Sequence, residues 1–157
     1  MATTFSPLYG TAGSVLTITL NALGNGASNQ SDMVDNSVPL YLDVAIMAKV
    51  ATTATAVSSS GTVEFYGIGN VGGAFSTDTA AAVAGSAGVG NARLIGILQA
   101  NSGNTTYAGG PWSVAAAFGG IMPTSWGVIA LNRTGAQLTN SASVQQMVFQ
   151  GYQEKGV

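Results

Sequence analysis

The chain contains no cysteine and no histidine among its 157 residues. Without cysteine it forms no disulfide, and it offers no thiolate as a metal ligand or a nucleophile. Without histidine, a serine or threonine nucleophile lacks its usual general base. These absences argue against the common hydrolase mechanisms, and we expect a protein without enzymatic activity, cofactor or metal.

Charge is also scarce, because charged residues make up 6% of the chain, whereas a typical soluble domain has roughly 25%. The four bases are scattered along the sequence, at Lys49, Arg93, Arg133 and Lys155. Nucleic acids are bound by clustered lysine and arginine side chains that displace counterions. The scattered bases therefore predict that the protein does not bind nucleic acid.

Hydrophobic residues make up an ordinary 46% of the chain, and its mean hydropathy is +0.35. A soluble monomer normally keeps a charged surface that prevents association. A hydrophobic chain with so few charges therefore predicts that other subunits cover much of its surface, in a homo-oligomer or a larger assembly.

Signals for secretion or membrane insertion are missing from the sequence. The opening residues, MATTFSPLYG, have neither a basic region nor an apolar core of the signal-peptide type. No run of about 20 apolar residues occurs without glycine, proline or polar interruptions. We expect no membrane segment, and we expect one domain over residues 1–157, with residues 1–12 as an extended N-terminal arm.

Strict alternation of side-chain type runs from Val38 to Val50 and predicts a strand with one buried face. Further strands are predicted at Ser14–Ala22, Gly61–Gly69, Ala92–Ala100, Trp112–Phe118, Trp126–Asn132 and Ser143–Gln153. Segments rich in glycine, asparagine and serine separate them. Seven or eight short strands predict an all-β fold, an antiparallel β-sandwich of jelly-roll type, with a closed eight-stranded barrel as the alternative.

Helix signals are confined to two short segments. Within the glycine-rich residues 69–90, Thr77 or Asp78 is a candidate N-cap for a helix that ends at Gly85, and a long loop is the alternative. The segment Asn29–Asn36 is a second candidate helix.

Both tryptophans lie in the stretch Gly110–Leu138. Gly119 and Gly120 predict a tight bend after the first strand of this stretch, and Pro123 belongs in the connection. The second strand, Trp126–Asn132, is apolar on both faces. We therefore expect a central strand, covered on one face by the core and on the other by another layer or subunit.

Acidic residues give only a weak signal for catalysis or metal binding. Asp32 and Asp35 stand three residues apart, and with Glu64 they are a candidate acid–base group. Asp32 and Asp35, together with Asn29 and Asn36, are also a candidate calcium site, but the sequence lacks the ligand spacing of a calcium-binding loop. We favour a structural role in which these side chains cap or solvate the loop.

Aromatic side chains are the remaining candidates for a binding site. Exposed indole rings of Trp112 or Trp126 would offer a platform for sugars, but tryptophan in short strands is more typical of a core or an interface. The side chains that we predict at interfaces are Phe5, Leu8, Tyr9, Trp112, Trp126, Phe149 and Tyr152.

Five segments, in this order along the chain, carry a resemblance to a known group. They are SVPLYLDVAIMAKV, GTVEFYGIGN, ARLIGIL, GPWSVAAAFGGIMPTSWGVIALNRTGAQL and VFQGYQ. Together, between Val38 and Tyr152, the chain resembles small virion proteins of tailed bacteriophages. The resemblance implies a non-enzymatic β-sandwich or jelly-roll subunit that decorates the head, or that belongs to the neck or tail. It implies no catalytic residues.

These observations lead to one main expectation and two alternatives. We expect a capsid decoration (cement) protein of the virion, assembled in the cytoplasm of the host bacterium, which bridges subunits of the major capsid protein as a symmetric homo-oligomer such as a trimer. Phe5, Leu8 and Tyr9 are the expected anchor, and strands Ser14–Ala22 and Ser143–Gln153 are candidates for edge pairing between subunits. The alternatives are a neck, collar or tail accessory protein and a host-glycan-binding module on the virion surface.

Overall fold

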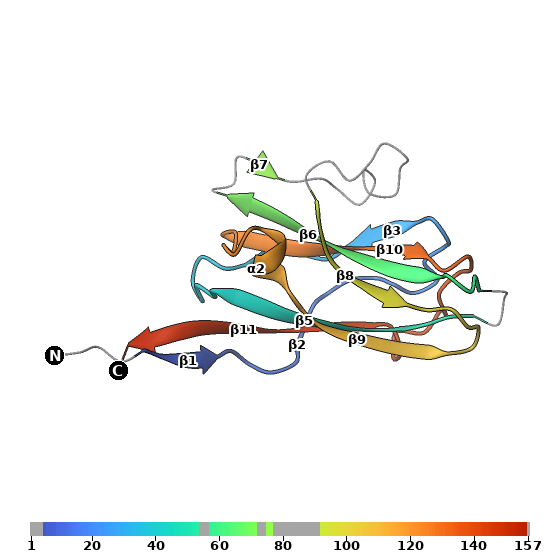
Figure 1. The fold of residues 1–157 in the computed structure, drawn as a ribbon, viewed down its shortest axis with the longest axis horizontal. Coiled ribbons are helices and arrows are strands. Elements are labelled where there is room, and N and C mark those ends of the chain that lie inside the picture. The colour runs from blue at the N-terminus through green and yellow to red at the C-terminus, as the bar shows by residue number, and fades with distance from the viewer. Residues whose placement is uncertain (1–4, 54–56, 72–74, 77–91, 157) are drawn as a thin grey trace.

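The chain folds into two antiparallel β-sheets that pack face to face, as the computed structural model shows for residues 5–53, 57–71, 75–76 and 92–156 (Figure 1). Almost all regular structure in these residues is β-strand, since the helix α2 (Val114–Ala117) has only four residues. The predicted all-β sandwich is confirmed, and its jelly-roll connectivity stays a prediction.

The five-stranded sheet has the order β1-β11-β5-β9, and β2 also pairs with β11. Its strands are β1 (Phe5–Tyr9), β2 (Ser14–Val15), β5 (Asp43–Ala51), β9 (Thr106–Ser113) and β11 (Gln146–Gly156). Over Gln146–Tyr152, β11 therefore has β5 on one side, and β1 and β2 follow one another along its other side. The prediction that the edge of Ser143–Gln153 pairs with another subunit is wrong, because β5, β1 and β2 of the same chain occupy both edges of β11.

The six-stranded sheet has the order β3-β10-β6-β7, with β4 beside β10 and β8 beside β6. Its strands are β3 (Ser28–Gln30), β4 (Val34–Asp35), β6 (Thr62–Val71), β7 (Phe75–Ser76), β8 (Arg93–Gln99) and β10 (Ser125–Arg133). β10 lies in the interior of this sheet, and every residue from Trp126 to Asn132 is buried. The prediction of a central strand that is covered on both faces is confirmed.

The core lies between the two sheets and is built from alternate residues of the longest strands. Val44 and Ile46 of β5 meet Phe65 of β6 and Trp126 of β10 in one apolar cluster. Burying each such side chain contributes about 1.5–3 kcal/mol. A second apolar cluster includes Ile129 and Leu131 of β10. These two residues alternate along the strand with Val128 and Ala130 of the core, so they lie on the opposite face of the six-stranded sheet.

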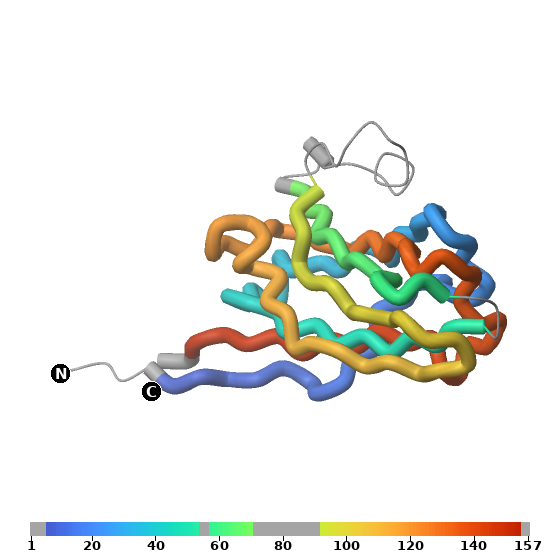
Figure 2. The backbone as a smooth tube through the Cα atoms, turned by 45° about the vertical axis from the view of Figure 1, so that its right-hand side comes forward, coloured from blue at the N-terminus to red at the C-terminus, as the bar shows by residue number. Residues whose placement is uncertain are grey.

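One side of the sandwich is closed by a segment that crosses between the sheets. Strand β2 ends at Val15, and the following residues bury Leu16 and Leu20 in the core. Figure 2 shows this blue segment passing from one layer to the other. The backbone carbonyl of Thr17 accepts a hydrogen bond from the backbone N–H of Asp32 at 2.9 Å. The predicted strand Ser14–Ala22 is therefore wrong after its second residue.

The predicted strand Trp112–Phe118 is also wrong, because a helical turn replaces it after Ser113. The Ser113 hydroxyl accepts a hydrogen bond from the backbone N–H of Ala116 at 3.0 Å. The Asp43 carboxylate accepts from the backbone N–H of Ala115 at 2.8 Å. These two side chains satisfy N–H groups that a helix leaves unpaired at its start.

The expected helix at Asn29–Asn36 is wrong as well, since this segment contributes residues to β3 and β4. The candidate helix that starts near Thr77 lies outside the described residues.

Candidate interaction surface at one end of the sandwich

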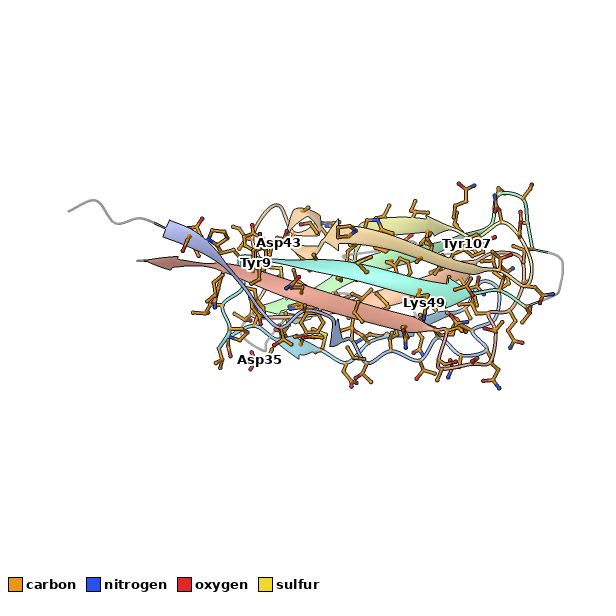
Figure 3. All side chains as sticks on the ribbon, turned by 90° about the horizontal axis from the view of Figure 1, so that it is seen from below. Tyr9, Asp35, Asp43, Lys49 and Tyr107 are labelled. Carbon is orange, nitrogen blue, oxygen red and sulfur yellow. The ribbon has the colours of Figure 1, made fainter. Side chains whose placement is uncertain are left out.

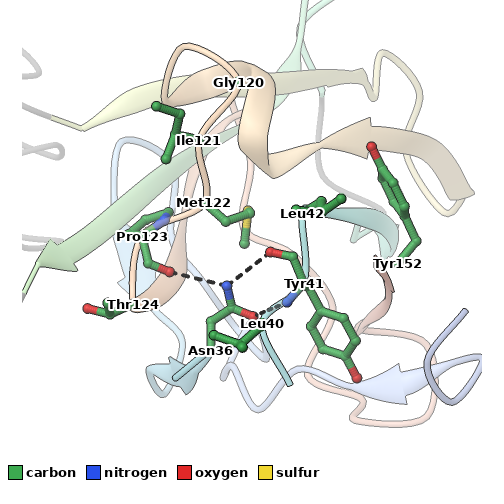
Figure 4. Close-up of a pocket in the computed structure, with 10 residues that line it drawn as sticks. All are labelled: Asn36, Leu40, Tyr41, Leu42, Gly120, Ile121, Met122, Pro123, Thr124 and Tyr152. Atoms are coloured by element: carbon green, nitrogen blue, oxygen red, sulfur yellow. Dashed lines mark hydrogen bonds between the residues drawn. The ribbon is translucent and has the colours of Figure 1, made fainter. Parts of the chain in front are cut away.

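Two loops at one end of the sandwich enclose a pocket of about 550 Å³ (Figure 4). One loop spans Asn36–Leu42 and leads into β5, and the other spans Gly119–Thr124 and leads from α2 into β10. None of the ten residues that line the pocket is ionisable except two tyrosines. The pocket therefore presents a neutral, largely apolar surface.

Asn36 holds the first loop together, and it is buried. Its side-chain oxygen accepts a hydrogen bond from the backbone N–H of Tyr41 at 2.8 Å, and its side-chain nitrogen donates to the Tyr41 carbonyl at 3.1 Å. The same nitrogen lies 3.5 Å from the carbonyl of Pro123 in the second loop. We name these contacts the Asn36 clamp, because the Asn36 side chain joins the two ends of the first loop and also contacts the second loop.

Leu40, in the middle of the clamped loop, has a backbone φ of +51°. A leucine in this left-handed region costs about 1–3 kcal/mol unless its surroundings compensate. The backbone N–H of Leu40 donates to the Asn36 carbonyl at 3.1 Å. The clamp thus maintains an unfavourable backbone conformation that turns the Leu40 side chain outward.

The second loop is anchored on the six-stranded sheet. Pro123 is buried, and a Cβ built on Gly69 would approach its ring to 2.6 Å, which shows how closely the proline lies on the strand. Gly119 and Gly120 have φ values of +75° and +91°, so the predicted tight bend is confirmed. Ile121, which follows them, is 77% exposed.

The first loop exposes three more apolar side chains, of Val38, Leu40 and Leu42. Together with Ile121 and Tyr152 they form what we call the end surface. In most soluble proteins, large apolar patches with a fixed shape mark interaction sites. Here both loops are held by buried side chains, so the patch has a fixed shape.

A two-stranded ribbon projects at the same end. Residues Phe5–Leu8 pair only with Gln153–Gly156, because β5 begins at Asp43, opposite Tyr152 (Figure 1). The predicted extended arm is therefore a paired strand in residues 5–9. Leu8, Tyr9 and Tyr152 are exposed there, as expected for interface residues, and the burial of the Phe5 side chain is not described.

Three predicted interface residues point into the core instead. Trp126 is 0% exposed, and Phe149 packs edge-on against it with ring centroids 5.3 Å apart. Trp112 packs on Phe65 at 5.2 Å, and its ring covers Gly96. The interface assignment is wrong for Trp126 and has no support for Trp112 and Phe149, and neither indole offers the open face that a sugar platform needs.

Carboxylates do not gather at the end surface. The backbone N–H of Ser37 donates to the Asp35 carboxylate at 2.8 Å and holds the pKa of Asp35 below its ordinary value. The Asn29 side chain donates to the backbone carbonyl of Thr19. Across the described residues no three acidic side chains lie close enough to hold a metal ion. The structural role that we favoured for this group is consistent with these contacts.

Glu64 instead joins a small polar group on the six-stranded sheet. The Tyr66 hydroxyl donates to its carboxylate at 2.6 Å, and Arg133 Nε lies 3.3 Å from the same oxygen. Burial, followed by the hydrogen bond to Glu64, raises the pKa of Tyr66 to about 12. Because Arg133 is half exposed, this ion pair contributes little to stability.

Sequence reasoning missed the loop residues of the end surface. The alternation that Val38, Leu40 and Leu42 share with Val44 predicts that they lie on the buried side of a strand. The signal that distinguishes these loop residues from the strand is Pro39, because proline has no backbone N–H to donate to a neighbouring strand.

Comparison with models of known protein families and with curated proteins finds no match to this chain. In the part of the chain that the structure describes, no helix has the length and apolar character needed to cross a membrane.

Proposed function

We propose that this protein is a non-enzymatic structural protein of a tailed-phage virion, which decorates the capsid and bridges subunits of the major capsid protein. The observation that carries the proposal is the end surface, where four large apolar side chains stand exposed on two clamped loops. A surface of this kind fits a partner by shape and apolar burial, and it needs few charges.

The scarcity of charge supports the same role. Subunits of a particle are held at high local concentration, so contacts that are weak one at a time become effective together. A chain with 6% charged residues is poorly suited to remain a free monomer. It is well suited to a position in which neighbours cover its apolar surface.

The first test is to purify particles from the bacterial culture that produces the protein and to count its copies by quantitative mass spectrometry. Hundreds of copies per particle support a decoration protein, and about a dozen support the neck, collar or tail alternative. Absence from the particles overturns the virion role.

The second test examines the end surface itself. Purified protein is added to particles that lack it, and bound copies are counted for the double variant Leu40→Ser, Ile121→Ser. Loss of two exposed apolar anchors is expected to weaken binding about 30-fold or more. Ile97→Ser is the matched control, because Ile97 is 50% exposed on the six-stranded sheet, away from this end. If the double variant binds particles as tightly as the Ile97→Ser control, the contacts with the capsid lie outside the end surface.

A further inference from the structure

The outer face of the five-stranded sheet carries an unusual apolar row. Val15 of β2 pairs with Val148 of β11, and Val148 pairs with Met47 of β5. Pro111 of β9 lies on the side of Met47 that faces away from Val148, and all three residues line the same hollow. The row therefore runs across four strands, on the face that points away from the core.

The chain leaves this row open. Val15 is 75% exposed and Met47 is 47% exposed. On the six-stranded sheet, in contrast, Ile129 and Leu131 alternate with the core positions of β10 and are fully buried. A sheet with one free face normally shows polar residues on it. The apolar row thus indicates that another surface covers the five-stranded sheet.

A hollow of about 330 Å³ lies beside the row. Small or rigid residues line much of it, namely Gly13, Ala45 and Pro111, and Met47 stands at its border. Ala45 and Met47 are two positions apart on β5 and point to the same face. A small residue next to a protruding one is the arrangement that lets two identical faces interlock.

Charge on this face is also arranged for self-association. Asp43 and Lys49 lie at opposite ends of β5, as Figure 3 shows from the outer side. Lys49 has no ion-pair partner among the described residues. The Asp43 carboxylate accepts hydrogen bonds from the Ser113 hydroxyl at 2.7 Å and from the backbone N–H of Ala115 at 2.8 Å. No other ionisable residue stands between them on β5.

We infer that this outer face binds a second copy of the chain across a two-fold axis that lies between the two faces and perpendicular to β5. The axis passes close to Ile46, midway between Asp43 and Lys49. It places Lys49 of each copy opposite Asp43 of the other. It also places Met47 of each copy over Ala45 of the other, in the hollow.

The expected affinity follows from the size of the face. The stretch from Asp43 to Lys49 across four strands measures about 20 Å by 19 Å, or roughly 400 Å² per copy. Stable specific interfaces bury about 800 Å² per partner. We therefore expect a weak dimer in solution, with a dissociation constant on the order of 10–100 µM.

This inference deepens the proposed function. It rests on that function in one respect only, which is that a weak dimer becomes effective at the high local concentration on a particle. It names a face that is separate from the end surface, and it gives the oligomer a two-fold axis instead of the three-fold axis of a trimer. Its test uses purified full-length protein in solution, so its failure leaves the particle experiments unaffected.

The test is sedimentation equilibrium over a concentration series, with circular dichroism to confirm that each variant is folded. The full-length chain is expected to pass from monomer to dimer and to dissociate more readily at high salt. Met47→Asp, which places a carboxylate at the centre of the face, is expected to weaken the dimer tenfold or more. Ile97→Asp, at a similarly exposed site on the other sheet, is expected to leave it unchanged.

Lys49→Glu tests the register of the two copies. It places like charges opposite one another at both ends of β5 and is expected to weaken the dimer about tenfold, whereas Lys49→Ala is expected to remove the salt dependence with a smaller loss. A monomer at every concentration, a trimer, or a folded Met47→Asp variant that dimerises like the original protein overturns the inference.

Discussion

Removal of the Asn36 clamp is the sharpest test of how the end surface keeps its shape. In Asn36→Ala the backbone N–H and the carbonyl of Tyr41 lose their side-chain partners, at 2.8 and 3.1 Å. Each such hydrogen bond contributes about 0.5–1.5 kcal/mol, and a polar group left unpaired away from water costs more. We therefore expect the free energy of unfolding to fall by about 2–3 kcal/mol.

The effect should be concentrated in the loop. Without the clamp, Leu40 has less to hold it at a φ of +51°, so the loop should open more often than the rest of the fold. The amide of Tyr41 is expected to exchange with deuterium about 30- to 150-fold faster, which corresponds to the same 2–3 kcal/mol. Binding to particles should fall too, although Asn36 is buried.

Hydrogen–deuterium exchange and urea denaturation provide the two measurements. Asn140→Ala is the matched control, because Asn140 is exposed and its loss is expected to change stability by less than about 0.5 kcal/mol. If Asn36→Ala leaves the exchange of the Tyr41 amide unchanged, the clamp does not hold the loop, and the reasoning about a preorganised surface is refuted.

Three further predictions concern the core and the polar group on the six-stranded sheet. Gly96→Ala is expected to destabilise the fold by about 1–3 kcal/mol and to shift tryptophan fluorescence, since a Cβ there would lie 2.5 Å from atoms of the Trp112 ring; an unchanged melting temperature contradicts this. Trp126→Phe is expected to cost less than the roughly 3–5 kcal/mol of a truncation to alanine, because the indole N–H has no acceptor among the described residues and phenylalanine removes that unpaired donor; denaturation of both variants decides it. Because the folded-state pKa of Tyr66 is raised to about 12, its contribution to stability is fully present below the ordinary tyrosine pKa near 10 and is lost as the pH rises through 12. Absorbance at about 295 nm should show one late-titrating tyrosine that Tyr66→Phe removes, and an unchanged titration curve in that variant contradicts the assignment.

The sequence allowed the long strands to be predicted, because their side-chain alternation is enforced by the core. In β5 the buried positions Val44, Ile46, Ala48 and Val50 follow the predicted period. In β10 the continuous apolar run correctly predicted burial on both faces. Both patterns reflect the same cause, which is that a strand places successive side chains on opposite faces.

The failures arise where local polar contacts decide the backbone. Alternation continues from Val38 to Leu42, but Asn36 turns this segment into a loop through contacts to Tyr41 that no periodicity reveals. The helix after Ser113 depends on Asp43, which is 70 residues away from that serine in the sequence. Distant partners of this kind are invisible to a pattern read along the chain.

The strand β9 was missed for a different reason. Its sequence, TYAGGPWS, contains two glycines and a proline, which are residues typical of turns. In the fold, Gly109 lies against Leu98 and Trp112, where a Cβ would approach to 2.7 and 3.0 Å. The glycine is therefore required by the close approach of the other layer, and only the packed sheets reveal this requirement.

The pairing of β1 with β11 has a practical consequence for engineering. Phe5 and Gly156 are cross-strand neighbours, so a short linker could join these two strand ends without disturbing either sheet. New termini could then be opened in the exposed loop that connects β8 in one sheet to β9 in the other, around Ser102, at the opposite end of the sandwich (Figure 1). Such a circular permutant would carry fused peptides far from the end surface, whereas a fusion to either natural strand end would lie directly beside it.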